Sequence, residues 1–323
     1  AQRLELREVP DGDAHGWIGR AHEIWLSLGH PQHETTSAPR PRATTSAFTG
    51  RRLPGAGDVL HAQLHAHPQR YDEILSQHLP CLLAAFGDLP PTWWFTRYRE
   101  MARPDAGQHL DLTLHLPRGT YGAAAEHTHT WASSLHTLRL SSGLVLATYQ
   151  PQTGRYGHAE AMDAAHQVFA ADSAAALTQI DLAGHTSDFA PQALTAASAF
   201  DLVTHLAPDP TRAEDWLVHK LPQGTGRLDR TLRDQVLALT APGGTSALSA
   251  LPGGSHVAEA WRTRAVALRV YRTTLAEDRD PLAVARTLLH QHHVRALGVN
   301  PSAEEVTLRL ARTAALTHRM TNR

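Results

Sequence analysis

Residues 149–156, which read YQPQTGRY, bring together groups that could bind or activate a substrate. The guanidinium of Arg155 is a rigid fork of donors that could bind a carboxylate or polarise a carbonyl. Tyr149 and Tyr156 add hydroxyls, and Gln152 adds an amide. The segment follows the strand-like run LVLATY and precedes an alanine-rich helix, and such junctions commonly face solvent or a ligand. We expect a binding site here, although Arg155 taken alone also fits an ordinary surface arginine in a turn.

Polar side chains alternate with leucines or alanines in two further segments. In HLDLTLHLP, the residues His109, Asp111 and Thr113 share one face of an expected strand. If the strand WWFTRYRE pairs with it, Arg97 and Tyr98 contribute a cation and a hydroxyl nearby. The polar faces are either a wall of a substrate groove or an ordinary solvated sheet surface. The second segment, DVLHAQLHAH, presents a similar row that consists of His61, Gln63, His65 and His67.

The segment LLHQHHVRALG places His290, His292 and Arg295 near the end of an expected helix. Imidazole titrates close to neutral pH, so one of these histidines could act as a general acid or base. The same side chains could instead be favourable positive charges at the negative end of the helix dipole.

The chain has 23 histidines, so a metal site has to be considered. Three HxH pairs occur, but none belongs to an HExxH arrangement or has a cysteine partner. Walker, Rossmann and GxSxG patterns are also absent from the sequence. We therefore expect neither a metal ion nor another cofactor. The HxH pairs are His65/His67, His127/His129 and His290/His292.

Hydrophobic periodicity predicts the elements that would position these groups. Half-buried strands are predicted in residues 58–67, 93–100, 109–117 and 144–149. Helices are predicted over 71–86, where Pro80 would introduce a kink, and over 120–139. The fold class is therefore α+β, with a small antiparallel sheet in the N-terminal half and a mostly helical C-terminal half. The later helices are predicted near 158–181, 191–206, 211–220, 226–240, 255–277, 281–297 and 302–317, the last capped by Ser302 with Glu305.

Two parts of the chain differ in composition. Residues 1–56 are predicted to form an N-terminal helix, over 14–30, and a mobile linker, whereas residues 57–323 are predicted to form the main domain, which carries the candidate site residues. The linker contains several arginines, which either attract an acidic peptide or simply belong to a disordered connection.

The overall composition is ordinary for a globular protein, with 42% apolar and 19% charged residues. A formal net charge of −1 gives no general attraction to nucleic acid or to a membrane. No apolar run approaches the roughly 20 residues that cross a bilayer, and no signal peptide is visible, so a cytoplasmic location is expected. Cys81, the single cysteine, lies in an apolar setting and is expected to be a buried structural thiol rather than a nucleophile.

Four segments, in order, resemble the C-terminal domain of class I lanthipeptide dehydratases, which also stands alone in thiopeptide biosynthesis. Together they span residues 57–305. The signature RYG with the downstream DS, and the late HxH…R…LG pattern, carry most of the resemblance. The segments are GDVLHAQLHAHPQRYDEILSQHLPCLLAAFG, WWFTRY…HLDLTL, YQPQTGRYG…FAADS and LLHQHHVRALGVNPSAEE.

The resemblance implies an enzyme that acts on a precursor peptide. In the family, this domain eliminates glutamate from glutamylated Ser or Thr and uses an HxRxR motif. That motif here reads His109-Leu-Asp111-Leu-Thr113, and the family's acidic position before Arg155 is Gln152. Arginines hold carboxylates through charge-assisted bonds of about 1.5–3 kcal/mol each, so the usual elimination is not expected from this chain.

One branch of the family, the thiopeptide pyridine synthases, has abandoned elimination, and this chain is most similar to that branch. The resemblance implies a formal [4+2] cycloaddition of two dehydroalanines into a six-membered nitrogen ring, with loss of water and of the leader peptide. The implied partners are a leader-bearing precursor peptide and other enzymes of the pathway. For this reaction, the candidate catalytic residues are Arg155, Tyr156, His290, His292, Asp111 and Tyr98. The implied substrate-binding residues are Arg97, His109, Thr113, Tyr149, Gln152 and Arg295.

Two other functions remain open at this point. The chain could be a glutamate-eliminating lyase whose arginines come from other positions. It could also be a non-catalytic subunit that binds the peptide and delivers it to a partner enzyme.

Overall fold

The computed structural model describes residues 4–6, 26–28, 51–100, 107–186, 188–224, 226–277 and 279–321. The chain divides into two units, residues 1–45 and 46–323. In the first unit, β1 (Leu4–Leu6) pairs antiparallel with β2 (Leu26–Leu28). The predicted helix over 14–30 is therefore wrong at Leu26–Leu28, and its remaining residues lie outside the described ones, as does the predicted linker up to residue 50.

The second unit contains the predicted antiparallel sheet. Its strands are β3 (Val59–Ala66), β4 (Thr92–Arg99), β5 (Gln108–His115) and β6 (Ser141–Ala147), in the spatial order β4-β5-β3-β6. The register places His61 opposite Thr113, and Asp111 opposite both Gln63 and Thr96. Directly opposed residues share a face of a sheet, so the polar side chains of three strands converge on one face.

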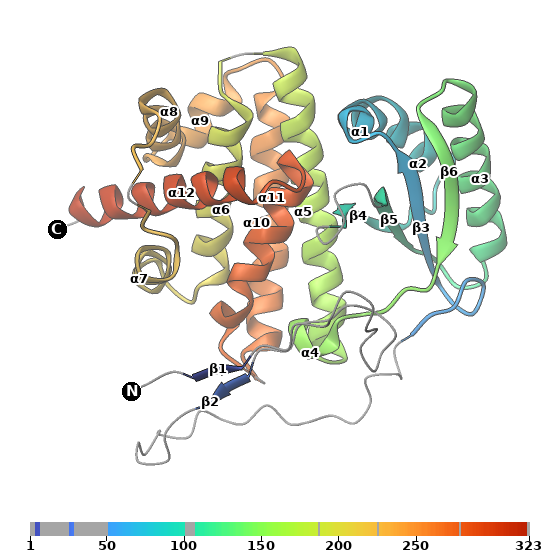
Figure 1. Cartoon of the computed structure of the whole chain (residues 1–323), viewed down its shortest axis with the longest axis horizontal. Helices are drawn as coiled ribbons and strands as arrows, with labels where there is room; N and C mark the ends of the chain where they lie inside the picture. The colour runs from blue at the N-terminus through green and yellow to red at the C-terminus, as the bar shows by residue number, and fades with distance from the viewer. Residues whose placement is uncertain are drawn as a thin grey trace. The chain divides into compact units, whose positions relative to one another are not determined.

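The leucines of β3 and β5 form the other face and are buried. They pack against the helical segments α1 (Tyr71–Glu73), α2 (Leu79–Ala84) and α3 (Tyr121–Thr137), and Figure 1 shows α3 beside β6. The strict alternation of apolar and polar residues thus places one face of the sheet in a core and the polar side chains on the other face.

The predicted helix over 71–86 is interrupted by a π-helical turn at Ile74–His78, directly before Pro80. Proline has no N–H to donate and clashes with the carbonyl four residues earlier, so the wider turn accommodates it. The prediction that Cys81 is buried is wrong. On α2, Leu79 and Leu82 face the core, and Cys81 is exposed because it points to the other side of the helix.

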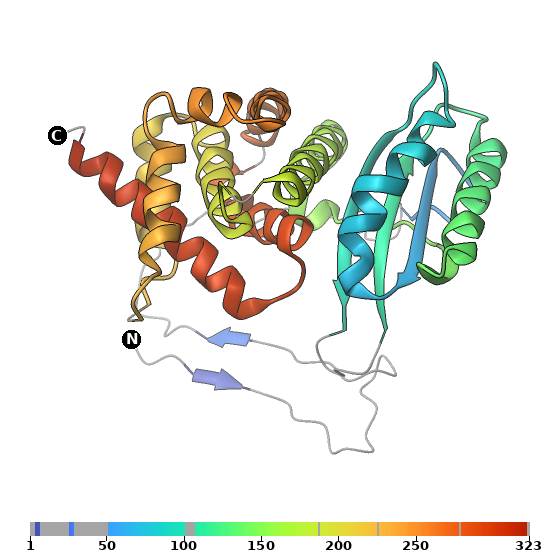
Figure 2. The same cartoon turned by 90° about the horizontal axis from the view of Figure 1, so that it is seen from above.

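The C-terminal half is helical, as predicted, and Figure 2 shows these helices gathered on one side of the sheet. The short helix at Gly244–Ser249 lies between the predicted helices 226–240 and 255–277, where no helix was predicted. The final helix is capped by Asn300 rather than by Ser302, because the Asn300 side-chain oxygen accepts a bond from the Ala303 N–H. The helices are α4 (Thr153–Tyr156), α5 (Glu160–His185), α6 (Pro191–Leu206), α7 (Pro210–Lys220), α8 (Arg230–Thr240), α9 (Gly244–Ser249), α10 (Gly254–Leu275), α11 (Ala285–Leu297) and α12 (Pro301–Thr321).

The helical half is attached to the sheet along the edge strand β4. The N–H of Phe95 donates to Ser173 Oγ of α5 at 3.1 Å, and the carbonyl of Phe95 accepts a bond from Arg295 Nε of α11 at 2.9 Å. These side chains satisfy backbone groups that an edge strand would otherwise leave unpaired.

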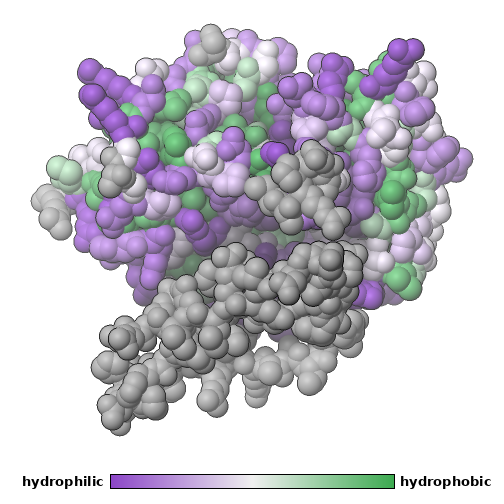
Figure 3. Space-filling model, in the orientation of Figure 1, coloured by the Kyte–Doolittle hydropathy of each residue, from purple (hydrophilic) through white to green (hydrophobic). Residues whose placement is uncertain are grey.

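Within the described ranges, no helix combines the length and the apolar character needed to span a bilayer. Figure 3 shows hydrophilic and hydrophobic residues mixed on the visible face.

Candidate functional site

A cavity of about 370 Å³ lies between the polar face of the sheet and the helical half. Strands β3, β4 and β5 supply one wall, helices α5 and α11 supply another, and the segment 148–156 that follows β6 completes the lining. Seven of the residues expected in the site line this cavity, namely Tyr98, Asp111, Thr113, Tyr149, Gln152, Tyr156 and Arg295.

Asp111 is an anion held between two imidazoles. Its Oδ1 lies 3.4 Å from His61 Nε2 and 3.3 Å from His109 Nε2, and both histidines sit on neighbouring positions of the same sheet face. Burial alone would raise the pKa of Asp111, but the two imidazoles outweigh it and lower that pKa to about 2. The cavity wall therefore carries a carboxylate charge at neutral pH.

The Tyr149 hydroxyl shares a hydrogen bond of 2.7 Å with His166 Nε2 of α5. The His166 ring stacks on Trp94 with the centroids 5.0 Å apart. Burial, with a smaller contribution from His115, lowers the pKa of His166 to about 4, so the ring is neutral at physiological pH. Trp94 and Phe169 then form an aromatic wall beside a neutral hydrogen-bonded pair.

Tyr156 closes the cavity where β6 leads into α5. Its carbonyl accepts a bond from the Tyr271 hydroxyl at 2.8 Å, which fixes the backbone. Burial raises the pKa of the Tyr156 hydroxyl despite the nearby positive charges of Arg295 and Arg155, so the phenol keeps its proton. Gly157 has a φ of +100°, and a Cβ there would approach Ala161 Cβ to 2.6 Å, so this turn requires glycine.

Arg295 brings the only Lys or Arg charge among the described residues that line the cavity, and that charge is already balanced. Its Nη1 donates to Asp172 Oδ2 at 2.8 Å, and both side chains are buried. Asp172 also accepts bonds from Arg264 Nη1 at 2.9 Å and from His292 Nδ1 at 2.8 Å. Burial raises the pKa of Asp172, yet His292 and the two guanidiniums lower it well below its usual range. Asp172 is therefore ionised.

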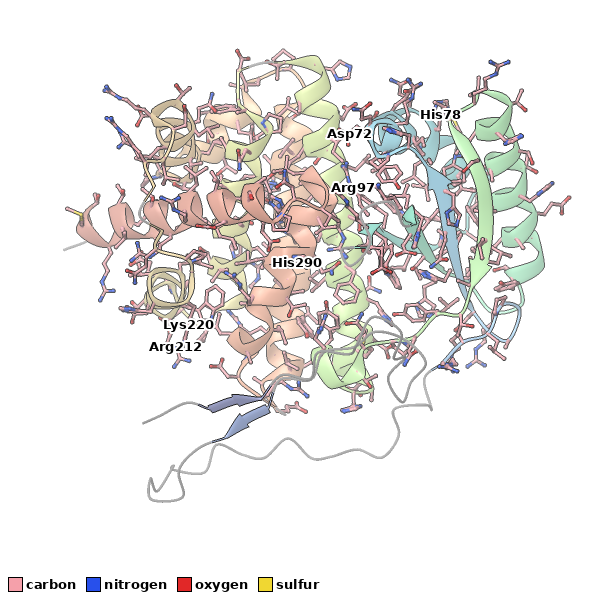
Figure 4. All side chains as sticks on the ribbon, in the orientation of Figure 1. Asp72, His78, Arg97, Arg212, Lys220 and His290 are labelled. Atoms are coloured by element: carbon pink, nitrogen blue, oxygen red, sulfur yellow. The ribbon has the colours of Figure 1, made fainter. Side chains whose placement is uncertain are left out.

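Several predicted site residues lie outside the cavity lining. Arg97 points to the opposite face of β4 and donates to Asp72 Oδ1 at 2.7 Å, a pair that Figure 4 shows. The strand alternation decides this, since Tyr98 occupies the cavity face. His290 is exposed and bonds to Glu304 at 2.9 Å, away from the sheet in Figure 4. His292 is fully buried against Asp172.

Two further predicted residues lie next to the cavity without lining it. His109 contacts Asp111 and stacks on Tyr98 with centroids 4.5 Å apart, so it positions both side chains. Arg155 is exposed, and its charge and hydrogen bonding lower the pKa of the Tyr156 hydroxyl against the effect of burial.

His61 was expected on the polar sheet face but not among the site residues, and the structure places it in the cavity wall. Its Nδ1 lies 2.9 Å from Thr113 Oγ1. The alternation of β3 with β5 was the signal that could have identified it. Trp94, Met162, Phe169 and Gln291 also line the cavity. Trp94, Phe169 and Gln291 lie in segments that carry the family resemblance, but they were not singled out as site residues.

The described side chains include no group of three or more His, Cys, Asp or Glu residues arranged to hold a metal ion. The two histidines near Asp111 instead lie 3.4 and 3.3 Å from its Oδ1, and His61 also shares a hydrogen bond with Thr113.

The α+β architecture with this cavity corresponds to a known protein family. Residues 60–315 match the family described as lantibiotic biosynthesis dehydratase, C-terminal region, and the chain belongs to this family. No curated protein sequence matches the chain.

Two solved structures share the fold. The tRNA-dependent lantibiotic dehydratase MibB from Microbispora sp. 107891 is 24% identical with a TM-score of 0.71, and the match covers 84% of this chain but only 29% of MibB. The pyridine synthase TbtD from thiomuracin biosynthesis is 16% identical with a TM-score of 0.52, and the match covers 80% of this chain and 98% of TbtD. At these identities the likenesses establish the fold alone.

Proposed function

We propose that this chain is a pyridine synthase of the thiopeptide type, which joins two dehydroalanines of a ribosomally made peptide into a six-membered nitrogen ring. The charge of the cavity carries the proposal. Where eliminating members of the family have two arginines, this chain has Asp111 and Thr113, and both line the cavity. The Asp111 carboxylate is anionic at neutral pH, because its pKa lies at about 2.

A glutamate leaving group is itself an anion. Two charges of like sign about 4 Å apart repel by roughly 4 kcal/mol near a protein surface. Arg295 offers little compensation, because Asp172 already neutralises it at 2.8 Å. A neutral peptide that closes a ring is not repelled by the Asp111 carboxylate. The cavity therefore favours cyclisation over glutamate elimination.

The other residues that line the cavity suit a reaction between two parts of the same substrate peptide. Trp94, Met162 and Phe169 give apolar surface for alkenes, while the Tyr98 and Tyr156 phenols can donate to amide oxygens. Holding both dehydroalanines together in this space would convert a slow encounter into an intramolecular step, which can supply about 7–11 kcal/mol of the barrier.

The test is to incubate the purified chain with a leader-bearing peptide that contains two dehydroalanines. We expect a ring product that has lost water, together with the leader released as a separate amide, both followed by mass spectrometry. A peptide with a single dehydroalanine is the matched control and should remain unchanged.

A second reaction decides between the proposal and its main rival. A glutamylated Ser peptide should give no free glutamate with this chain. Release of glutamate, with no ring from the bis-dehydroalanine peptide, would identify a lyase instead. Tight leader binding with neither product would identify a peptide-delivering subunit.

A further inference from the structure

Three cavity residues form a continuous chain of polar groups across two strands. His61 on β3 lies directly opposite Thr113 on β5, and its Nδ1 is 2.9 Å from Thr113 Oγ1. The other ring nitrogen, Nε2, is 3.4 Å from Asp111 Oδ1. A hydroxyl, an imidazole and a carboxylate therefore follow one another, and all three residues line the same cavity.

The carboxylate determines which nitrogen of His61 carries the proton. Asp111 is ionised at neutral pH and can only accept hydrogen bonds, so it favours a proton on the facing Nε2. The lone pair on Nδ1 is then directed at Thr113 and accepts its hydroxyl proton. The Thr113–His61 contact is then a hydrogen bond, and the His61–Asp111 contact, at 3.4 Å, is an electrostatic one.

The surroundings of His61 reinforce this arrangement. His109 Nε2 lies 3.3 Å from the same Asp111 oxygen and holds the carboxylate in place. The Tyr149 ring, whose centroid is 6.1 Å from that of His61, carries a phenol that burial keeps protonated by raising its pKa. Thr113 is only 2% exposed, so its hydroxyl meets the cavity and little bulk water.

We propose that Thr113, His61 and Asp111 form a proton relay for the peptide bound in the cavity, with the Thr113 hydroxyl in contact with the substrate. The relay rests on the proposed ring-forming function, because it supplies the proton transfers that this reaction needs. Thr113 is the catalytic residue, His61 stores the proton, and Asp111 positions His61 and stabilises its imidazolium form.

The first transfer converts an amide into its imidic acid tautomer. Thr113 takes the proton from the amide nitrogen while its own proton moves to His61 Nδ1. The proton then returns through Thr113 to the carbonyl oxygen of the same amide, as the C=O π electrons move to oxygen and the nitrogen pair forms C=N. The relay is back in its starting state, and no co-reactant is consumed.

The loss of water after ring closure has the same balance. A ring C–H proton enters the relay, the C–H electrons form the new C=C bond, and the C–O electrons leave with the hydroxyl. The relay returns its proton to that hydroxyl, which departs as water.

A purely structural role is the alternative, since cross-strand pairs of this kind also stabilise sheets. Three substitutions separate the two roles. Thr113→Val keeps the side-chain shape but removes the hydroxyl, Thr113→Ser keeps the hydroxyl, and His61→Asn removes the base. His185→Asn is the matched control, because His185 lies near Asp181 at an exposed helix end, outside the cavity.

We expect Thr113→Val and His61→Asn to lower kcat for ring formation about a hundredfold or more with little change in KM. Thr113→Ser should stay within about fivefold of the parent, and His185→Asn should match it. The unfolding temperature of each variant, measured by circular dichroism, shows whether the fold survives. A folded Thr113→Val variant that retains full activity overturns the relay.

A second measurement is independent of any reaction. In protein labelled with ¹⁵N-histidine, the His61 resonances should report a proton on Nε2, and Asp111→Asn should abolish this preference. A proton on Nδ1 that is unaffected by Asp111→Asn overturns the relay. If the parent protein makes no ring but shows the expected tautomer, the proposed function fails, while the arrangement of Thr113, His61 and Asp111 stands.

Discussion

The Arg295 guanidinium on α11 bonds to the Asp172 carboxylate on α5 at 2.8 Å, and both side chains are buried. The same guanidinium holds the Phe95 carbonyl of β4 and lines the cavity. One ion pair thus connects two helices to the sheet edge and fixes a wall of the site. The late arginine and the DS signature, which are far apart in the sequence, meet at this point.

Asp172→Asn should destabilise the fold by about 3–5 kcal/mol, because it leaves the Arg264 and Arg295 charges buried without their counter-ion. Urea unfolding measures this effect. Asp181→Asn, on the same helix but exposed, is the control and should change stability by less than about 0.5 kcal/mol. Equal, small effects at both positions would contradict the role given to Asp172.

Tyr156→Phe removes one hydroxyl group from the cavity and keeps the aromatic ring. We expect ring formation to fall about ten- to a hundredfold, because Tyr156 lines the cavity and its hydroxyl can donate a proton to a bound peptide. Arg155→Ala should give a smaller loss, since Arg155 acts through that hydroxyl. Tyr121→Phe, which removes a hydroxyl from α3, should leave the rate unchanged. Full activity in Tyr156→Phe would exclude this phenol from catalysis.

Stability should decrease as the pH falls from about 7 to about 4. Burial lowers the pKa of His166 and of His293 to about 4, whereas both titrate near 6.5 in the unfolded chain. Between these values the unfolded state binds more protons, so stability rises with pH. Each histidine accounts for roughly 3 kcal/mol across this window.

His293→Leu provides the corresponding test at this buried position. Both ring nitrogens of His293 are buried without a hydrogen-bond partner, so the replacement should add about 1 kcal/mol of stability at neutral pH. It should also flatten the pH dependence, which thermal melts at several pH values would show. A steeper dependence in this variant would refute the assignment.

The substitution His290→Ala tests whether His290 is catalytic, as the resemblance implies, or remote from the substrate, as its position in the structure indicates. The resemblance implies a catalytic histidine at this end of α11, but His290 is exposed and bonded to Glu304 at 2.9 Å. We expect the variant to keep ring formation within about twofold of the parent, as followed by mass spectrometry. A hundredfold loss would show that His290 reaches the substrate after a rearrangement of α11.

The sheet and its polar face could be predicted from the sequence because the leucine alternation of β3 and β5 is strict. Leu60, Leu64, Leu110 and Leu114 permit only one face to be buried, and this fixed the directions of Asp111 and Thr113. The helices of the C-terminal half could also be predicted, because their apolar residues recur with the period of a helix.

Other features depend on partners that are distant in sequence. In WWFTRYRE both faces carry large side chains, so the strand phase that turns Arg97 away from the cavity was not apparent. Arg264 resembles a surface arginine of α10, yet it is fully buried because Asp172 and Asp201 meet it there. Position on a helix likewise separated exposed His290 from buried His292.

The cluster around Asp172 contains two buried guanidiniums, Arg264 and Arg295, the buried Asp172 carboxylate and the partly exposed Asp201 carboxylate, so its formal charges cancel. Replacing any one member leaves an unpaired charge in the interior. A library of single substitutions should therefore find these four positions nearly immutable, whereas variants that exchange a cation and an anion together should survive. Random mutagenesis that changes one codon at a time will rarely produce such double substitutions. The cavity wall that contains Arg295 is therefore difficult to alter through the residues packed behind it.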